Sequence, residues 1–249
     1  MLEFQHVTFQ YDSEDFNIID DLSFTVEPEE FISIIGISGC GKSTIFKLTN
    51  GLLKRKSGNI LLNGQDIASV KHAAGYMPQK DLLFPWRTIE KNLCLPMEIA
   101  KVPQSEQTQR VSDILKEVGL SDYAAKYPKD LSGGMRQRAA LIRTLALSPS
   151  LLLLDEPFSA LDYQTRLTVS DDIYRILRTQ HMSAVLVTHD ISEAISFCDR
   201  IIVLTSRPAS VKKTFDIHLT LNGDRTPFKA RMAPEFKDYF NEIWGELNV

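Results

Sequence analysis

The stretch Gly36-Ile-Ser-Gly-Cys-Gly-Lys-Ser-Thr44 decides the fold of this 249-residue chain. Its spacing matches the pattern G-x-x-x-x-G-K-[ST], in which glycines let consecutive backbone N–H groups turn inward around a polyphosphate. Lys42 can reach the β- and γ-phosphates, and the hydroxyl of Ser43 can bind Mg²⁺. The apolar run Phe31–Ile35 precedes the loop and a helix-compatible segment, 44–50, follows it. The pattern therefore predicts a phosphate-binding loop between a strand and a helix, rather than a chance glycine-rich turn.

A second apolar strand ends in two carboxylates. Leu151–Leu154 is followed directly by Asp155, Glu156 and Pro157. In an open α/β sheet, ligands bind at the carboxyl edge of the strands, which is where these side chains are expected. Alone, a strand that ends in acidic residues is usually just solvated. Beside a phosphate loop, we expect Asp155 to hold Mg²⁺ through water and Glu156 to orient and polarise the attacking water.

Hydrophobic periodicity divides the chain into parts. Residues 22–26 alternate apolar and polar side chains, as in a half-buried strand, whereas 88–148 has helical spacing. We predict an α/β fold in which strands and helices alternate around a mostly parallel sheet, with an inserted α-helical subdomain. The chain is expected to be a single domain, 1–249, with the nucleotide-binding core at 1–85 and 149–249 and the helical subdomain at 86–148.

Local signals predict where several helices begin and end. Asp190 with Glu193 three residues later is a capping-box pattern that opens a helix. Gly119 is expected to end the helix whose apolar face lies within 111–118. Near the C-terminus, aromatic and aliphatic residues recur at three- and four-residue steps across 236–247, which predicts an amphipathic helix.

Composition excludes several classes of protein. The net charge is −4 and the pI is near 5.8, which argues against broad nucleic-acid binding. The three cysteines have no spacing typical of a zinc site or a disulfide framework. The N-terminus lacks the basic and apolar regions of a signal peptide, and no apolar run approaches the ~18–20 residues of a membrane span.

The discriminating segment is Leu131-Ser-Gly-Gly-Met-Arg-Gln-Arg138. Ser132 is a good N-cap, and the two glycines leave backbone N–H groups open to an anion. Here the chain resembles the ATP-binding subunits of ABC transporters, whose signature LSGGQ is followed by a basic-glutamine-basic run. Met135 replaces the usual glutamine, and we expect the substitution to be tolerated.

The resemblance covers nearly the whole chain. It implies a phosphate-loop NTPase core of the RecA-like type, with a mostly parallel sheet, an antiparallel β subdomain and an inserted α-helical subdomain, and it implies roles for further residues. Tyr11 matches the aromatic residue that stacks on adenine, Gln79 the Q-loop glutamine that senses Mg²⁺ and the attacking water, and His189 the switch histidine at the γ-phosphate. Ser159–Asp162 resembles the D-loop. The implied catalytic residues are Glu156, His189, Gln79 and Lys42, and the implied metal ligands are Ser43, Gln79 and Asp155. The implied ATP-binding residues are Tyr11, Gly36, Ser38, Gly39, Cys40, Gly41, Lys42, Ser43, Thr44, Ser132, Gly133, Gly134 and Asp162.

The resemblance also implies an assembly. Two such subunits associate head to tail, so that Ser132 and Gly134 of one chain complete the ATP site of the other. The expected partners are transmembrane permease subunits and, through the complex, an extracellular or periplasmic solute-binding protein, with no nucleic acid. The expected location is the cytoplasmic face of the cell membrane, as a peripheral protein, with ATP and Mg²⁺ as cofactors.

Two local features indicate which branch of the ABC transporter family the chain resembles. Leu83–Arg87 and Ser206-Arg207-Pro208 resemble importer subunits for nitrate, sulfonates and taurine, and the length leaves no room for the C-terminal regulatory domain of many sugar importers. The open alternatives are an importer of another substrate class and an ABC-type ATPase that acts on ribosomes or DNA. A phosphate-loop kinase or GTPase would have no use for the LSGGMRQR segment. Cys40 is either a reactive thiolate beside Lys42 or a small residue that fits the loop.

Overall fold

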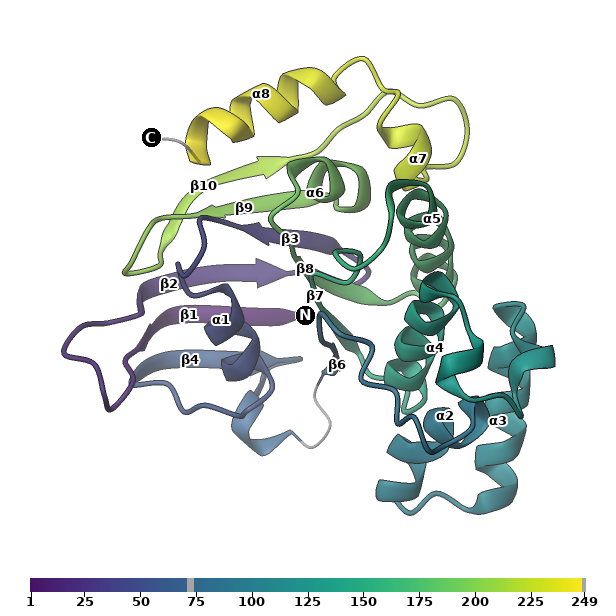
Figure 1. Cartoon of the computed structure of the whole chain (residues 1–249). Helices are drawn as coiled ribbons and strands as arrows, with labels where there is room; N and C mark the ends of the chain where they lie inside the picture. Colours follow the sequence, from purple (N-terminus) through teal and green to yellow (C-terminus); the bar gives the residue numbers. More distant parts are fainter. Residues whose placement is uncertain (71–73, 248–249) are drawn as a thin grey trace.

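A six-stranded sheet forms the centre of the computed structural model, which describes residues 1–70 and 74–247 (Figure 1). The strands lie in the order β10-β9-β3-β8-β7-β6, and every neighbouring pair is parallel except β9 and β10. Their bounds are β3 Phe31–Ile35, β6 Gly75–Met77, β7 Leu151–Asp155, β8 Ser183–Val187, β9 Arg200–Leu204 and β10 Val211–Asp216. The predicted core ranges include residues 71–73 and 248–249, which lie outside the described part.

A smaller antiparallel sheet lies beside the central one, with the strand order β2-β1-β4-β5 (Figure 1). Its strands are β1 Leu2–Phe9, β2 Ile19–Val26, β4 Ser57–Leu62 and β5 Gln65–Asp66. Asn63 and Gly64 join β4 to β5 with φ angles of 51° and 77°. Left-handed angles at both turn residues favour an Asn-Gly pair, which is what the sequence supplies here.

Helices surround the central sheet, and α2 and α3 extend from it beside α4 (Figure 1). The helices are α1 Lys42–Thr49, α2 Ile89–Ile99, α3 Gln104–Glu117, α4 Gly133–Leu145, α5 Tyr163–Thr179, α6 Ile191–Phe197, α7 Pro227–Ala230 and α8 Phe236–Leu247. Short 3₁₀ turns lie at Ile67–Ser69, Ser121–Tyr123 and Pro128–Asp130. No helix in the described residues is long and apolar enough to cross a membrane.

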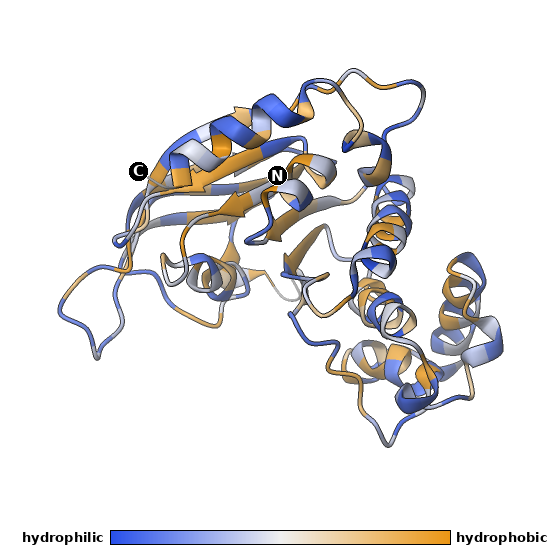
Figure 2. Ribbon diagram, turned by 45° about the horizontal axis from the view of Figure 1, so that its top comes forward, coloured by the Kyte–Doolittle hydropathy of each residue, from blue (hydrophilic) through white to orange (hydrophobic). Residues whose placement is uncertain are grey.

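Alternate side chains of the inner strands enter two different hydrophobic cores, as period-two geometry requires. On β7, Leu151 and Leu153 join the core that contains α1 and the small sheet, whereas Leu152 and Leu154 join the core that contains α4 and α5. All four side chains are almost fully buried. Figure 2 shows the central strands as largely hydrophobic between helices of mixed polarity. A continuous apolar run is therefore the expected composition of such a strand.

The predicted fold class is confirmed: a mostly parallel sheet, an antiparallel β sheet and an inserted group of helices are all present. The expected end of α3 is also confirmed, since Gly119 follows it with a φ of 67°. The predicted C-terminal helix is α8, and its Ile243 is buried.

The capping box at the start of α6 is only half right. Asp190 accepts hydrogen bonds from the N–H groups of Ser192 and Glu193, at 2.8 and 3.2 Å. The Glu193 carboxylate does not return to the N–H of Asp190, as the pattern predicts, but accepts the Thr188 hydroxyl at 2.7 Å. Thr188 also accepts the Asp190 N–H, so a buried threonine takes the place that the pattern gives to glutamate.

Candidate functional site

A cavity of about 430 Å³ opens where the phosphate loop meets the carboxyl edge of the central sheet. Most of its lining residues are predicted from the sequence: Tyr11, Gly36, Ser38, Gly39, Gly41, Lys42, Ser43, Thr44, Glu156 and His189. Two others, Ile18 and Arg207, are not. The volume lies within the range of small-molecule sites.

The phosphate loop presents unpaired backbone donors at the start of α1. The N-cap is Gly41, which has no side chain to satisfy the first N–H groups, and the first turn carries no acidic residue. Such a helix start attracts anions through its open N–H groups and its dipole. Gly39 and Gly41 have φ angles of 79° and 119°, which L side chains rarely adopt. Glycine is thus required by the backbone path as well as by the approach of a ligand.

The Lys42 ammonium folds over its own loop. Its Nζ donates to the carbonyl oxygens of Gly36 and Ile37, at 2.7 and 3.0 Å. These contacts hold a cation at the mouth of the loop, where three donors on a flexible stem can turn toward phosphate oxygens.

Tyr11 also lines the cavity. Its hydroxyl is 3.2 Å from Oγ1 of Thr44, and its ring packs edge-on against Phe9 at a centroid distance of 4.8 Å. The contact ties the segment after β1 to the first turn of α1. An aromatic ring is therefore fixed close to the phosphate loop.

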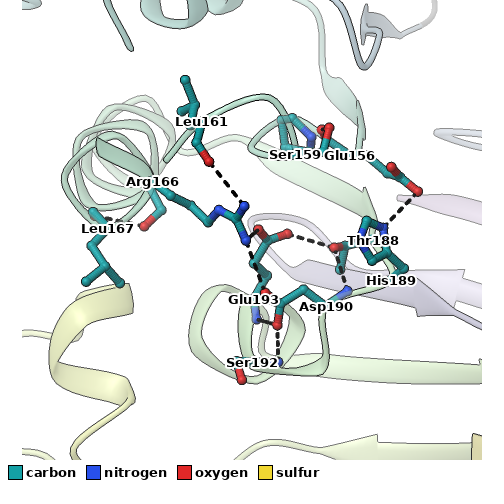
Figure 3. A network of polar contacts seen from close by, with 12 residues as sticks. Glu156, Ser159, Leu161, Arg166, Leu167, Thr188, His189, Asp190, Ser192 and Glu193 are labelled. Atoms are coloured by element: carbon teal, nitrogen blue, oxygen red, sulfur yellow. Dashed lines mark hydrogen bonds and ion pairs between the residues drawn. The ribbon is translucent and has the colours of Figure 1, made fainter. Parts of the chain in front are cut away.

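Glu156 lies between two sequence-predicted partners, Gln79 and His189, and Figure 3 shows its contact with His189. Its Oε2 accepts the Gln79 side-chain N–H at 2.8 Å, and its Oε1 is 3.2 Å from Nδ1 of His189. The residue has a φ of 45°, and its N–H donates to the carbonyl of Val187 on β8 at 2.8 Å. A non-glycine residue in the left-handed region is strained, and such strain often marks functional sites. The turn directs the carboxylate into the cavity.

Asp155 has a separate environment from Glu156. It lies at the end of β7, where the Tyr76 hydroxyl donates to its Oδ2 at 2.9 Å. Burial raises the pKa of Asp155 above its ordinary value, the Glu156 charge adds to this, and the Tyr76 hydrogen bond and Lys42 oppose it. Burial likewise raises the pKa of Tyr76, so the phenol remains a donor at neutral pH. Neither Asp155 nor Gln79 lines the cavity itself.

Five predicted ATP-binding residues do not line this cavity: Cys40, Ser132, Gly133, Gly134 and Asp162. Ser132 caps α4 by accepting the Met135 N–H at 3.3 Å, and Asp162 caps α5 by accepting the Thr165 N–H at 3.0 Å. A Cβ on Gly133 would lie 3.4 Å from Leu161, the residue before Asp162. The signature segment and the D-loop are therefore neighbours, and together they form a second polar surface.

Gly134 has a packing role that the sequence pattern does not reveal. A Cβ at this position would lie 2.9 Å from Cγ2 of Thr165 and 3.0 Å from Cγ2 of Val169. Real Cβ atoms essentially never show the first distance, and the second is tighter than nine in ten real Cβ contacts. The glycine thus lets α4 approach α5 closely, in addition to any contact that its N–H makes with a ligand.

The Cys40 side chain points into the protein rather than into the cavity. It is 1% exposed and belongs to the hydrophobic core beneath α1. A Cβ on Gly36 would lie 2.8 Å from its Sγ, so the loop closes tightly around the thiol. The structure favours the hypothesis that Cys40 is a small residue fitting the loop.

A polar network connects the D-loop with the end of β8 (Figure 3). The Arg166 guanidinium on α5 donates to the Leu161 carbonyl at 3.2 Å and contacts Asp190 at 3.4 Å and Glu193 at 3.6 Å. Burial is the main cause that raises the pKa of Glu193, which is 5% exposed. The Arg166 guanidinium therefore links the residue before Asp162 to the residue after His189.

The sequence prediction missed three residues of the site. Tyr76 lies three residues before Gln79 and holds Asp155, but tyrosine next to a strand end is common. Ile18 carries no sequence signal. Arg207 is part of the Ser-Arg-Pro segment, which the sequence assigns to a branch of the family rather than to the nucleotide. In the structure its Nε donates to the Gly39 carbonyl at 2.6 Å.

The fold and the cavity define a P-loop nucleotide-binding ATPase. The family model of ABC transporters matches residues 19–159, and the chain belongs to this family. It is 46% identical to an uncharacterized ABC transporter ATP-binding protein of Bacillus subtilis, over 99% of this chain and 95% of that protein. It is 39% identical to an aliphatic sulfonates import ATP-binding protein of Bacillus licheniformis (94% and 88% covered). A nitrate import ATP-binding protein of Synechocystis is 36% identical (90% and 86% covered).

Among solved structures, the chain is similar to the ATP-binding cassette MJ0796, captured as a dimer in a post-hydrolysis state with ADP and Pi. The TM-score is 0.73 at 27% identity, and the match covers 88% of this chain and 99% of that chain. The chain is therefore an ATP-binding subunit of the ABC type and an ATPase, and its relatives include importer subunits.

Proposed function

We propose that this chain is the ATP-hydrolysing subunit of a membrane importer for a small anion. The observation that carries the proposal is the Glu156 carboxylate, held between Gln79 and His189 at the mouth of a phosphate-loop cavity. A carboxylate at that place is suited to orient water for attack on a γ-phosphate. Lys42 and the open N–H groups of α1 neutralise the phosphates, and Tyr11 packs on the adenine.

The residues near the cavity fit a magnesium ion. The Ser43 hydroxyl, the Asp155 carboxylate and the amide oxygen of Gln79 are hard oxygen donors, which Mg²⁺ prefers together with phosphate oxygens and water. Bound there, the ion would neutralise charge on the β- and γ-phosphates. The Tyr76 hydrogen bond keeps Asp155 oriented and favours its charged form.

We infer that the working unit is a head-to-tail pair of subunits. Ser132 at the start of α4 is exposed and lies outside the chain's own cavity. The first turn of α4 carries no acidic side chain, which leaves this helix start suited to an anion. A second copy that presents its bound nucleotide to this surface would contact both Ser132 and the start of α4. The dimeric neighbour supports this arrangement.

The membrane partner is proposed to dock next to the helical insert, which we take as residues 86–148. Trp86 is 70% exposed and tilts against Phe84 at 5.1 Å between ring centroids. The buried Asn92 side chain holds the turn by bonding the backbone of Phe84, Arg87 and Thr88. An exposed tryptophan on a fixed turn is a typical anchor for a partner protein.

The same segment is connected to the catalytic carboxylate. Asp81, two residues after Gln79, accepts the Arg136 side-chain N–H at 3.1 Å, and Arg143 donates to the Asp81 carbonyl at 2.8 Å. Both arginines belong to α4. A change at Gln79 on hydrolysis would therefore be felt by α4 and by the turn at Trp86, which is how ATP turnover would move a permease.

The proposed solute is a nitrate- or sulfonate-like anion, as in the named relatives. This part of the proposal rests on similarity to whole subunits of similar length, together with the Leu83–Arg87 and Ser206–Pro208 segments. An importer of another solute is the alternative, because permease and binding protein choose the solute. Uptake of labelled nitrate, taurine and an alkanesulfonate by cells with and without the gene would decide between them.

Co-purification tests the proposed coupling. The tagged chain, solubilised from membranes of its own host with detergent, is expected to retain a multi-span membrane protein identified by mass spectrometry. Trp86→Asp should lose that protein and keep ATP binding. Met232→Asp, which changes a 69%-exposed methionine after α7, is the matched control and should retain it. Equal retention by Trp86→Asp would refute the docking site, and the absence of any membrane protein from the wild-type preparation would refute the coupling.

A further inference from the structure

Arg207 lines the nucleotide cavity, yet no phosphate-loop or ABC motif in the sequence accounts for it. It lies in the loop between β9 and β10, 168 positions after Gly39 of the phosphate loop. Its Nε donates to the Gly39 carbonyl at 2.6 Å. Its Nη2 lies 3.5 Å from the point that a Gly39 Cβ would occupy, so the guanidinium rests on the bare face of that glycine.

The loop that carries Arg207 is fixed on both sides. Within the loop, Thr205 accepts the Ser210 N–H at 2.9 Å. The neighbouring Ala209 is fully buried and exchanges backbone hydrogen bonds with the segment after Tyr11: its N–H donates to Ile18, and its carbonyl accepts the Asp20 N–H. Ile18 itself lines the cavity. The β9–β10 hairpin therefore forms a wall of the cavity, and its hydrogen bonds hold Arg207 at the phosphate loop.

Most of the guanidinium's capacity is unused. Within residues 1–70 and 74–247, Arg207 has no acidic partner, and its two terminal nitrogens have no hydrogen-bond partner. Arginine presents five N–H donors in a planar fork, which suits a phosphate group held by two parallel bonds. The Nε contact with Gly39 can persist while Nη1 and Nη2 face the cavity.

We propose that Arg207 is a further nucleotide-binding residue, which contacts phosphate oxygens common to ATP and ADP. Lys42 and Arg207 then approach the polyphosphate from different chain segments, and both rest on carbonyl oxygens of the same loop in this structure. Arg207 makes no contact with Glu156 or Gln79 among the described residues, so it contributes to affinity and not to the hydrolytic step.

Three substitutions separate a phosphate contact from a clamp on the loop. Arg207→Gln keeps a donor for the Gly39 carbonyl but loses the charge, Arg207→Lys keeps the charge, and Arg207→Ala loses both. Lys237→Ala removes an exposed cation on α8 as the control for net charge. Dissociation constants for ATP, ADP and adenosine are measured on the full chain by competition with a fluorescent ATP analogue, at low and high salt. Thermal unfolding without nucleotide checks that each variant is folded.

Arg207→Ala and Arg207→Gln should bind ATP and ADP about 5–10-fold more weakly, the effect of one charge-assisted contact reduced by solvent exposure. Adenosine should bind as in the wild type, Arg207→Lys should recover part of the loss, and high salt should shrink the differences. Wild-type affinity in Arg207→Gln would overturn the proposal in favour of a clamp on Gly39, and an equal loss for adenosine would overturn it in favour of cavity shape.

Discussion

The starts of α1 and α4 are two anion-binding helix ends with different degrees of completeness. At α1, the N-cap is a glycine with no side chain, so the donors of the first turn are open and face a cavity. At α4, the Ser132 hydroxyl already satisfies one N–H, and the helix start does not line that cavity. The first end is therefore a site in a single chain, whereas the second becomes a site only when another surface covers it. Nucleotide binding should accordingly depend on the cavity half of the molecule, with α1, whereas hydrolysis should need both this half and the signature half, with α4.

The largest expected effect comes from Glu156→Gln, which should separate nucleotide binding from hydrolysis. The amide keeps the size of the side chain but loses the charge that polarises water, so hydrolysis should slow by about 10²–10⁴-fold while MgATP binding persists. If the second half completes the site, the ATP-bound dimer should accumulate, because its breakdown is blocked. Phosphate release measures the first effect, and size-exclusion chromatography with and without MgATP measures the second.

Near-normal turnover in this variant would remove Glu156 from its assigned role. Slow turnover without a dimer would keep the chemistry and contradict the shared site for the isolated chain. Glu3→Gln, a substitution of a glutamate on β1 outside the cavity, is the control and should match the wild type in both assays.

Two neighbouring glycines sharpen the comparison at α4. Gly134→Ala places a methyl group against Thr165 and Val169 and should lower the free energy of unfolding by about 1–3 kcal/mol, as overpacking does. Gly133→Ala meets Leu161 and Arg136 at ordinary contact distances and should be neutral or stabilising by about 0.5–1 kcal/mol, because alanine favours the helix. Urea unfolding of both variants measures the difference.

Nucleotide affinity should be unchanged in both glycine variants, since neither position lines the cavity. Equal stability of the two would contradict the close approach of α4 to α5. A loss of ATP affinity in the monomer would instead show that the two halves are not independent.

Much of the cavity half is predictable from the sequence because its side chains follow one another along the chain. The phosphate loop and the pair Asp155 and Glu156 each lie within one strand-to-loop turn, so local spacing determines their geometry. Arg207 is not predictable in this way, since only the hairpin's pairing with the Ile18 segment brings it to Gly39. The contact of Tyr76 with Asp155 depends likewise on the pairing of β6 with β7.

The fold shows the same limit. In the central sheet, the sequence identifies β3 and β7 as continuous apolar runs, whereas the edge strands β6 and β10 carry no such run. β1 is missed because its apolar residues change phase between Phe4 and Val7, where the pairing with β2 shifts register. His6 has a φ of 52° at that irregularity, and only a glycine at position 58 leaves room for its carbonyl, since a Cβ there would lie 2.2 Å away. Period-two alternation is lost at such a bulge.

A smaller effect concerns the charge at the sheet edge. The folded-state pKa of Asp155 is raised, so between its ordinary value of 3.8 and the raised value the native state binds more protons than the unfolded state. Stability from this group is therefore lost as pH rises through that window. Asp155→Asn should stabilise the nucleotide-free protein at pH 7 by up to about 1 kcal/mol, because water screens a half-buried carboxylate.

Thermal unfolding of Asp155→Asn and wild type between pH 3.5 and 8 tests this sign. The gain should vanish toward the acid end, and the variant should need more Mg²⁺ for ATP hydrolysis. A gain that is constant across the whole pH range would contradict desolvation as its cause. Tyr76→Phe is the matched variant: it removes the opposing hydrogen bond and should make the pH dependence steeper.

The smallest effect is expected at Cys40, although it lies inside the motif that decides the fold. Its thiol is 1% exposed, packs in the core beneath α1 and lies 3.8 Å from the Lys42 ammonium on the protein side of the loop. Cys40→Ala should therefore change the dissociation constant for MgATP by less than about threefold and cost about 1 kcal/mol of stability, the cost of a small cavity. Maleimide should label Cys40 of the native chain slowly, at a rate limited by local opening of the loop. MgATP should slow the labelling further only to the extent that the nucleotide stabilises the loop. Rapid labelling that abolishes ATP binding, with protection by MgATP, would place the thiol on the cavity side and make it part of the nucleotide site.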